Sequence, residues 1–174
     1  LVLGSADPVR WPEICDREGV DCSGVADQLW TELKLATEQA YDTSSACTFT
    51  AFHGYEYTSA RSISNQHRNV LFRGQETVNR PITFFEAPDP LSLWRQLEQE
   101  CLLRPGGCDV ITIPHNANWS NGNLFRPTRD LIDGKEEQAD LATLRARIEP
   151  LVEMFQHKGD AECRNGLEGI NGEE

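Results

Sequence analysis

Long apolar stretches are missing from this chain, because no run approaches the roughly 18 to 20 residues that a membrane-spanning helix needs. The segment also shows no basic start followed by an apolar stretch of the kind that marks a secretory signal. We therefore expect a soluble segment, and function classes that need a transmembrane helix within it are excluded.

Positive charge is scarce as well. The 16 Lys and Arg residues stand against 28 Asp and Glu residues, which gives a formal net charge of −12. Such a surface repels nucleic acid backbones and anionic membranes, whereas a small phosphate ester or a metal cation remains a compatible partner. The length of 174 residues, with 39% hydrophobic and 25% charged residues, predicts one globular domain over residues 1–174.

The sequence lacks any Cys-x-x-Cys pair, which disfavours a zinc ribbon or a thioredoxin-like motif. Six cysteines are present, and two pairs, Cys15/Cys22 and Cys101/Cys108, have the same spacing across expected surface turns. Each pair could close a disulfide loop worth about 2–3 kcal/mol, as in periplasmic or secreted proteins. Reduced thiols in a cytosolic protein are an equally good interpretation of the cysteines. We favour a periplasmic or secreted location slightly over a cytoplasmic one.

The two ends of the sequence do not resemble natural boundaries. Residues 1–4 are unlike a natural start, and residues 172–174 form a polar tail that carries no sign of a domain end. We therefore expect an internal fragment of a longer protein, with a processed or trimmed domain as the alternative.

Apolar periodicity predicts alternating strands and helices. We expect helices over residues 25–42, from Asp89 to about residue 104, and over 139–148. We expect strands over residues 47–58, 69–72, 108–114 and 151–156. This order is typical of an α/β fold with a largely parallel sheet.

Four histidines are available for chemistry: His53, His67, His115 and His157. Three of them stand at the margins of expected strands. Neutral imidazole is a common ligand of divalent transition metals, and Glu56 is a natural acidic companion. A lone histidine is more often a hydrogen-bonded strand residue, so spacing by itself does not decide between the two roles.

Four ordered segments carry a resemblance to a known family. They are residues 47–58 (CTFTAFHGYEYT), 67–73 (HRNVLFR), 113–122 (IPHNANWSNG) and 149–160 (EPLVEMFQHKGD). The chain resembles, from about residue 11 to 167, the bacterial domain of unknown function family 3604 (DUF3604), which is related to the polymerase and histidinol phosphatase (PHP) metallohydrolases. The resemblance implies part of a distorted β/α barrel, with mainly parallel strands, that holds two or three divalent ions.

The resemblance also implies roles for particular residues. Glu56, His67 and His115 match metal ligands of the family, and Zn, Mn or Fe would suit this set. Asn116 and Lys158 are the predicted catalytic residues, since the amide can orient substrate and the cation can neutralise phosphate charge. Predicted substrate contacts are Arg68, Asn118 and Trp119. His53 and His157 are expected to be incidental.

The chain departs from the family in having neither a His-x-His nor an Asp-x-His pair. The metal site is therefore expected to be incomplete, because flanking sequence is missing or because the site is lost. We predict that the parent is a metal-dependent hydrolase, a phosphoesterase acting through metal-bound hydroxide on a small-molecule substrate, and that the isolated chain binds metal weakly without turnover. The alternatives are a non-catalytic ligand-binding or interaction domain with a degenerate metal site, and amide or sulfate ester cleavage on the same scaffold.

Overall fold

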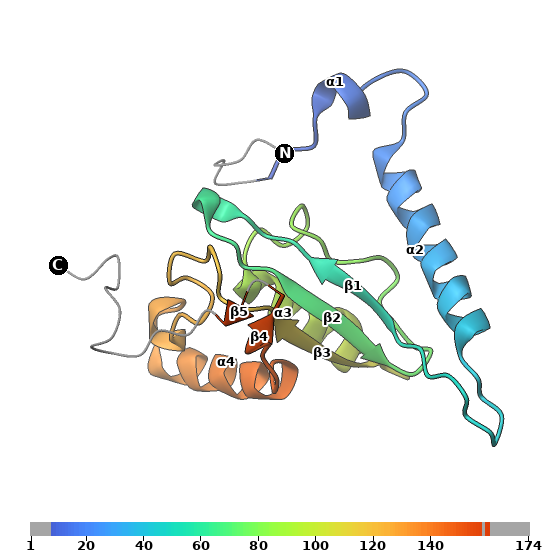
Figure 1. Cartoon of the computed structure of the whole chain (residues 1–174). Helices are drawn as coiled ribbons and strands as arrows, with labels where there is room; N and C mark the ends of the chain where they lie inside the picture. Colours follow the sequence, from blue (N-terminus) through green and yellow to red (C-terminus); the bar gives the residue numbers. More distant parts are fainter. Residues whose placement is uncertain (1–7, 158, 161–174) are drawn as a thin grey trace.

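A three-stranded antiparallel sheet forms the centre of the fold in the computed structural model, which describes residues 8–157 and 159–160. Strand β2 (Arg68–Arg73) lies between β1 (His53–Tyr57) and β3 (Asp109–Pro114) (Figure 1). Both pairings are antiparallel. The order along the chain is therefore also the order in the sheet.

The predicted barrel with mainly parallel strands is wrong for the described residues. The three strands form an open sheet, and residues 151–156 do not add a strand to it. Only Phe155–Gln156 (β4) is paired, and its partner is the short antiparallel strand β5 (Gly159–Asp160). The strand and helix order does not determine strand direction. Buried and more exposed residues alternate along β2, which is typical of an antiparallel sheet with one open face, but the continuous apolar run of residues 70–72 hides this alternation in the sequence.

Two of the helices begin at an aspartate whose side chain caps the first turn, and the sequence predicted the second of these starts. The side chain of Asp21 accepts from the Gly24 amide at 2.8 Å, and Asp89 accepts from the Ser92 amide at 2.8 Å. The elements are α1 (Pro12–Cys15), α2 (Cys22–Ala40), α3 (Pro90–Leu97), which continues as the π-helix η2 (Glu98–Leu102), and α4 (Lys135–Ile148). Two short 3₁₀ turns complete them, η1 (Arg61–Ile63) and η3 (Thr128–Asp130).

Helix α2 has the predicted position but buries little of its apolar face. Figure 1 shows it to one side of β1, extending away from the sheet. Val25 and Leu29 are 53% and 58% exposed. Trp30 is the buried residue of this helix, and its indole donates to the Val78 carbonyl at 3.2 Å. Helix α2 is therefore anchored chiefly by one side chain.

The hydrophobic core lies on the face of the sheet that α3 and α4 cover. Its strand residues are Tyr57, Val70, Phe72 and Val110, and its helix residues include Leu93, Trp94, Leu97, Leu141, Leu144 and Ile148. The Tyr57 hydroxyl donates to the Ala87 carbonyl at 2.7 Å, and burial raises the pKa of this phenol above its usual value. The other sheet face is open, with Leu71, Ile111 and Ile113 only partly buried.

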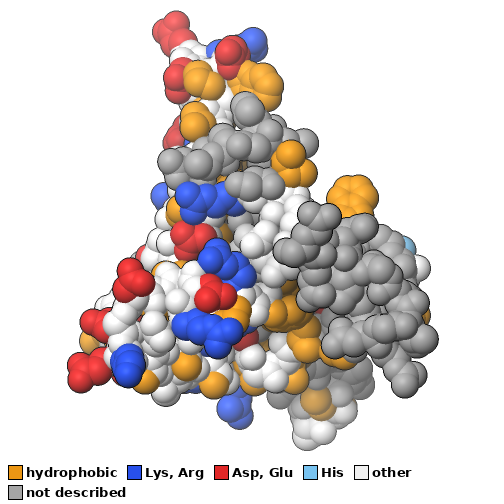
Figure 2. All heavy atoms as spheres, turned by 90° about the vertical axis from the view of Figure 1, so that its left-hand side faces the viewer, with side chains coloured by type: hydrophobic (Ala, Val, Ile, Leu, Met, Phe, Trp, Pro, Cys, Tyr) orange, Lys and Arg blue, Asp and Glu red, His pale blue; other side chains and the backbone are white. Residues whose placement is uncertain are grey.

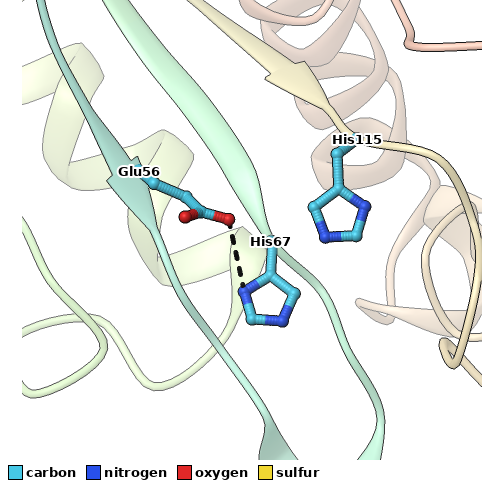
Figure 3. A group of neighbouring side chains, drawn as sticks. All are labelled: Glu56, His67 and His115. Carbon is cyan, nitrogen blue, oxygen red and sulfur yellow. Dashed lines mark ion pairs between the residues drawn. The ribbon is translucent and has the colours of Figure 1, made fainter. Parts of the chain in front are cut away.

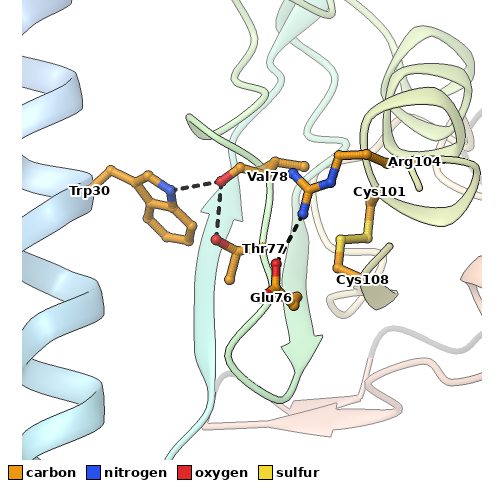
Figure 4. Close-up of a disulfide and its surroundings, with 7 residues drawn as sticks. All are labelled: Trp30, Glu76, Thr77, Val78, Cys101, Arg104 and Cys108. Atoms are coloured by element: carbon orange, nitrogen blue, oxygen red, sulfur yellow. Dashed lines mark hydrogen bonds and ion pairs between the residues drawn. A yellow bond between two sulfur atoms is a disulfide. The ribbon is translucent and has the colours of Figure 1, made fainter. Parts of the chain in front are cut away.

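Two disulfides close loops of equal length, between Cys15 and Cys22 and between Cys101 and Cys108. The second joins the end of the α3–η2 helix to the start of β3 (Figure 4). Both pairings match the spacing noted in the sequence, and such bonds are typical of proteins from oxidising compartments. Among the described residues, Cys47 keeps an exposed thiol.

The surface of the described part is mixed in charge. The face that looks left in Figure 1 shows acidic and basic side chains interleaved with apolar ones (Figure 2). Within residues 8–157 and 159–160, no helix combines the length and apolar character that crossing a bilayer requires.

Candidate metal centre

One end of the open sheet face brings Glu56, His67 and His115 together. Glu56 is on β1, His67 immediately precedes β2, and His115 immediately follows β3. Side chains alternate between the two faces of a strand, so Tyr57 and Arg68 point into the core while their neighbours Glu56 and His67 point outward. The antiparallel registers place Glu56 opposite Asn69, two residues along the chain from His67, and the His115 amide donates to the His67 carbonyl at 3.3 Å.

The side chains of this cluster face one another (Figure 3). One candidate ligand atom from each residue lies within 4.8 Å of the others. His67 Nδ1 is 3.8 Å from Glu56 Oε1, and the two imidazole rings stack with centroids 4.9 Å apart and planes at 16°. The Glu56 side chain is about half exposed, whereas that of His67 is mostly buried. The cluster is therefore reachable from solvent on its Glu56 side.

His115 is oriented by the backbone of its neighbour. Its Nδ1 lies 2.6 Å from the Asn116 carbonyl oxygen. Because a carbonyl only accepts, this contact requires a proton on Nδ1, and the neutral imidazole then keeps its lone pair on Nε2. Figure 3 shows that this second nitrogen points toward His67 and Glu56. Metal-binding histidines are commonly oriented in this way.

The turn after His115 is held by the segment that follows α4. Glu153 Oε2 accepts from the Asn116 amide at 2.8 Å, and the Glu153 amide donates to the Pro114 carbonyl at 3.0 Å. The Asn116 side chain donates to the Met154 carbonyl at 3.2 Å. Asn116 is buried and acts as part of this turn. Glu153 therefore holds the backbone beside His115.

The two loop residues predicted to contact substrate have different environments. The Asn118 amide donates to Asn116 Oδ1 at 3.2 Å, so Asn118 belongs to the same turn. Trp119 is 81% exposed and adopts a positive φ of 59°. A bulky residue rarely adopts this conformation, and it turns the indole toward solvent. The loop therefore presents an apolar ring four residues after His115.

Arg68, a further predicted site residue, lies apart from this cluster. Arg68 is fully buried on the core face, where it forms an ion pair with Glu149 and donates to the carbonyls of Gln66 and Leu124 at 2.8 and 3.2 Å. We therefore assign it a structural role instead of a substrate contact. Lys158 lies outside the described residues.

The remaining histidines are not part of this cluster. His53 is buried, with Nε2 3.9 Å from Glu38, and His157 is exposed. Sequence reasoning missed Glu149, whose carboxylate also accepts from Trp94 at 3.0 Å and Thr112 at 3.2 Å. A carboxylate directly after the apolar Ile148 at a helix end was the available signal.

Fold and cluster together define a mixed α/β domain with a two-histidine, one-carboxylate group on its open sheet face. Residues 5–171 match the DUF3604 family, which is described as a protein family of unknown function, so the chain belongs to that family. No curated protein and no solved structure matches the chain.

Proposed function

We propose that Glu56, His67 and His115 bind a divalent transition metal ion and that the protein is a metal-dependent hydrolase. The observation that supports this proposal is the convergence of three ligand atoms within 4.8 Å of one another, one from β1 and two from residues that flank β2 and β3. Residues far apart in the sequence meet here on a face that the core does not use.

The donor set fits such an ion. Two imidazoles and one carboxylate are ligands of catalytic zinc and of non-haem iron, and manganese also accepts them. Three protein ligands leave coordination positions for water or substrate, which is the arrangement of a catalytic site instead of a structural one. A bound cation would supply Lewis acidity, polarising a substrate oxygen and lowering the pKa of a coordinated water.

The protein contributes orientation and access. The Asn116 carbonyl holds the His115 ring so that Nε2 faces the cluster, and Glu153 holds the Asn116 backbone. Glu56 is the most exposed of the three ligands and borders the solvent side of the site. The exposed Trp119 ring offers an apolar surface to the uncharged part of a substrate.

Phosphate esters are the substrate class that we propose, and the residue likeness to PHP metallohydrolases supports this choice. That likeness also implies two or three ions, whose additional ligands we propose to lie in a longer parent chain. The two disulfides support a periplasmic or secreted location for this parent.

Metal binding tests the proposal most directly. Titration calorimetry with Mn²⁺ and Zn²⁺ on the chain, with its free thiols blocked, should show about one site. Glu56→Gln, His67→Gln and His115→Gln should each weaken it at least ~10-fold, because each removes one of three ligands. His157→Gln is the matched control, since His157 is exposed and lies outside the cluster. Unchanged affinity in all three cluster variants would contradict the proposal.

Hydrolysis is the second test and separates an enzyme from a binding domain. The longer parent protein, loaded with each metal, is assayed with chromogenic phosphate, sulfate and carboxyl esters. Phosphate ester cleavage that is lost in Glu56→Gln supports the proposed chemistry. Metal binding without cleavage of any ester would instead indicate a non-catalytic ligand-binding domain.

A further inference from the structure

We infer a second ligand site, for a small organic oxyanion, in a cavity on the opposite side of the sheet from the metal cluster. The cavity has a volume of about 240 Å³. Its charged lining consists of four arginines and two aspartates: Arg61, Arg68, Arg126, Arg145, Asp89 and Asp130. Four of only 16 basic residues thus surround one cavity in a chain of net charge −12.

The buried part of this lining carries more positive than negative charge. Arg68 and Arg145 share a single carboxylate, that of Glu149, and all three side chains are largely or fully buried. A buried charge without its own counterion is costly, so two guanidinium groups on one carboxylate favour a second anion nearby.

The two aspartates do not remove this surplus. Asp89 Oδ1 accepts from the amide and hydroxyl of Ser92 as a helix cap, and its other oxygen is 3.7 Å from Arg61. The Asp130 carboxylate is 3.7 Å from Arg129, which is outside the lining. Both carboxylates therefore have partners already.

Two of the arginines are placed to bind a ligand directly. The Arg126 side chain donates to the Asp130 carbonyl at 2.6 Å through Nη2, and among the described residues the side chain of Arg61 has the long contact of 3.7 Å to Asp89. A guanidinium has five N–H donors in a planar fork, so both keep donors for the paired oxygens of a carboxylate or phosphate. Arg68 and Arg145 instead donate to the backbone carbonyls of Leu124 and Arg126 and so hold residues 124–126 in place.

Apart from the amides of Gln66 and Asn123, the uncharged part of the lining is apolar and indicates the ligand class. Pro90, Leu91, Trp94, Leu124 and Leu131 line the cavity beside the arginines. An oxyanion with a small hydrophobic body fits this mixture better than inorganic phosphate, because the apolar walls gain from covering hydrophobic surface.

This site is separate from the proposed metal centre. Gln66 and Arg68 line the cavity, whereas His67 between them belongs to the open-face cluster. A ligand in the cavity therefore does not need the metal, and the inference does not depend on the proposed function.

Calorimetric titration of metal-free protein with phenylphosphonate, which phosphoesterases do not hydrolyse, tests the inference. We expect phenylphosphonate and benzoate to bind more tightly than inorganic phosphate. Arg126→Gln and Arg61→Gln should each reduce the affinity about tenfold, since each removes one charge-assisted contact. Arg73→Gln is the matched control, because Arg73 is 86% exposed and lies outside this lining. Melting curves establish that each variant is folded.

The outcomes separate the two sites. Binding that persists in Glu56→Gln but weakens in Arg126→Gln supports the cavity. Absence of binding at tens of millimolar ligand, or equal weakening in Arg126→Gln and Arg73→Gln, would overturn the inference. Binding that is lost only in His67→Gln would assign the anion to the cluster instead, and this too would overturn it.

Discussion

Strand β2 presents Arg68, Val70 and Phe72 to the core face of the sheet, whereas Asn69 and Leu71 follow His67 on the open face. The first set is buried, and even its charged member is enclosed by partners. The second set is exposed or partly buried. The core-facing side chains of this strand therefore stabilise the fold, whereas its open face continues from His67, a candidate metal ligand.

The comparison shows why polar residues on one strand need different interpretations. Arg68 and His67 are adjacent and both polar, but the Arg68 side chain is committed to Glu149 and to backbone carbonyls, while His67 faces a carboxylate and a second imidazole. A substitution on the core face should chiefly change stability. A substitution on the open face should chiefly change ligand binding.

The largest loss of stability is expected for Glu149→Gln. Removing the carboxylate leaves the fully buried Arg68 without its ion-pair partner, which should lower the free energy of unfolding by about 3–5 kcal/mol. Urea unfolding measures the change. Asp109→Asn, which removes an exposed carboxylate 3.8 Å from Arg73, is the control and should cost less than about 1 kcal/mol. Equal effects of the two variants would contradict the distinction between the faces.

The adjacent pair Phe72 and Leu71 gives a second contrast. Phe72→Ala should cost about 3 kcal/mol, because it opens a space among Trp30, Tyr55 and other core residues. Leu71→Ala, on the half-buried open face, should cost about 1 kcal/mol. Thermal and urea unfolding measure both. A larger loss for Leu71→Ala would show that the open face is covered in solution.

The next effect concerns ligand binding and depends on the proposed metal site. Glu153→Ala should weaken metal binding about tenfold, since the Asn116 backbone that orients His115 would lose its side-chain acceptor. Calorimetry measures the affinity, and the unfolding free energy of the metal-free variant should fall by about 1 kcal/mol, the cost of one hydrogen bond. Unchanged metal affinity would remove Glu153 from the positioning of the site.

The smallest effect is expected for the neighbours Tyr57 and Glu56. Tyr57→Phe removes a buried hydrogen bond to Ala87 and should cost about 1 kcal/mol, whereas Glu56→Gln in metal-free protein should cost almost nothing. Burial raises the Tyr57 pKa, so the unfolded chain ionises first and stability falls as the pH rises above about 10. That alkaline loss should be smaller in Tyr57→Phe, and unfolding at pH 8 and 10.5 measures it.

The sequence predicted local structure better than global arrangement. Asp89 and Pro90 marked the start of α3, and the apolar run before His115 marked β3, because caps and side-chain periodicity act over a few residues. The predicted strand direction was wrong, because strand pairing depends on contacts between residues that are distant in the sequence. The exposure of Val25 on α2 was missed for a related reason, since periodicity shows which residues share a helix face but not whether that face is covered.

The residues of the candidate site were predictable from the sequence, but the contacts that hold the surrounding structure in place were not. The motifs around Glu56, His67 and His115 suggested a shared role, and these residues do lie together. The partners of Arg68 and Asn116 lie 81 and 37 residues away in the sequence, so no local pattern could reveal them. Whether the cluster binds an ion stays a prediction.

The buried ion pair of Arg68 has a consequence for insertions and deletions. Moving β2 by a single residue against its neighbours would turn His67 toward the interior and push the guanidinium of Arg68 out to the surface. The partners of Arg68 resist that slip, since its guanidinium would lose the ion pair with Glu149 and the hydrogen bonds to two backbone carbonyls. An insertion or deletion of one residue within this strand should therefore be tolerated far less well than a substitution. The positions of the three candidate ligands thus depend on the ion pair of Arg68 with Glu149, which lies on the other side of the sheet.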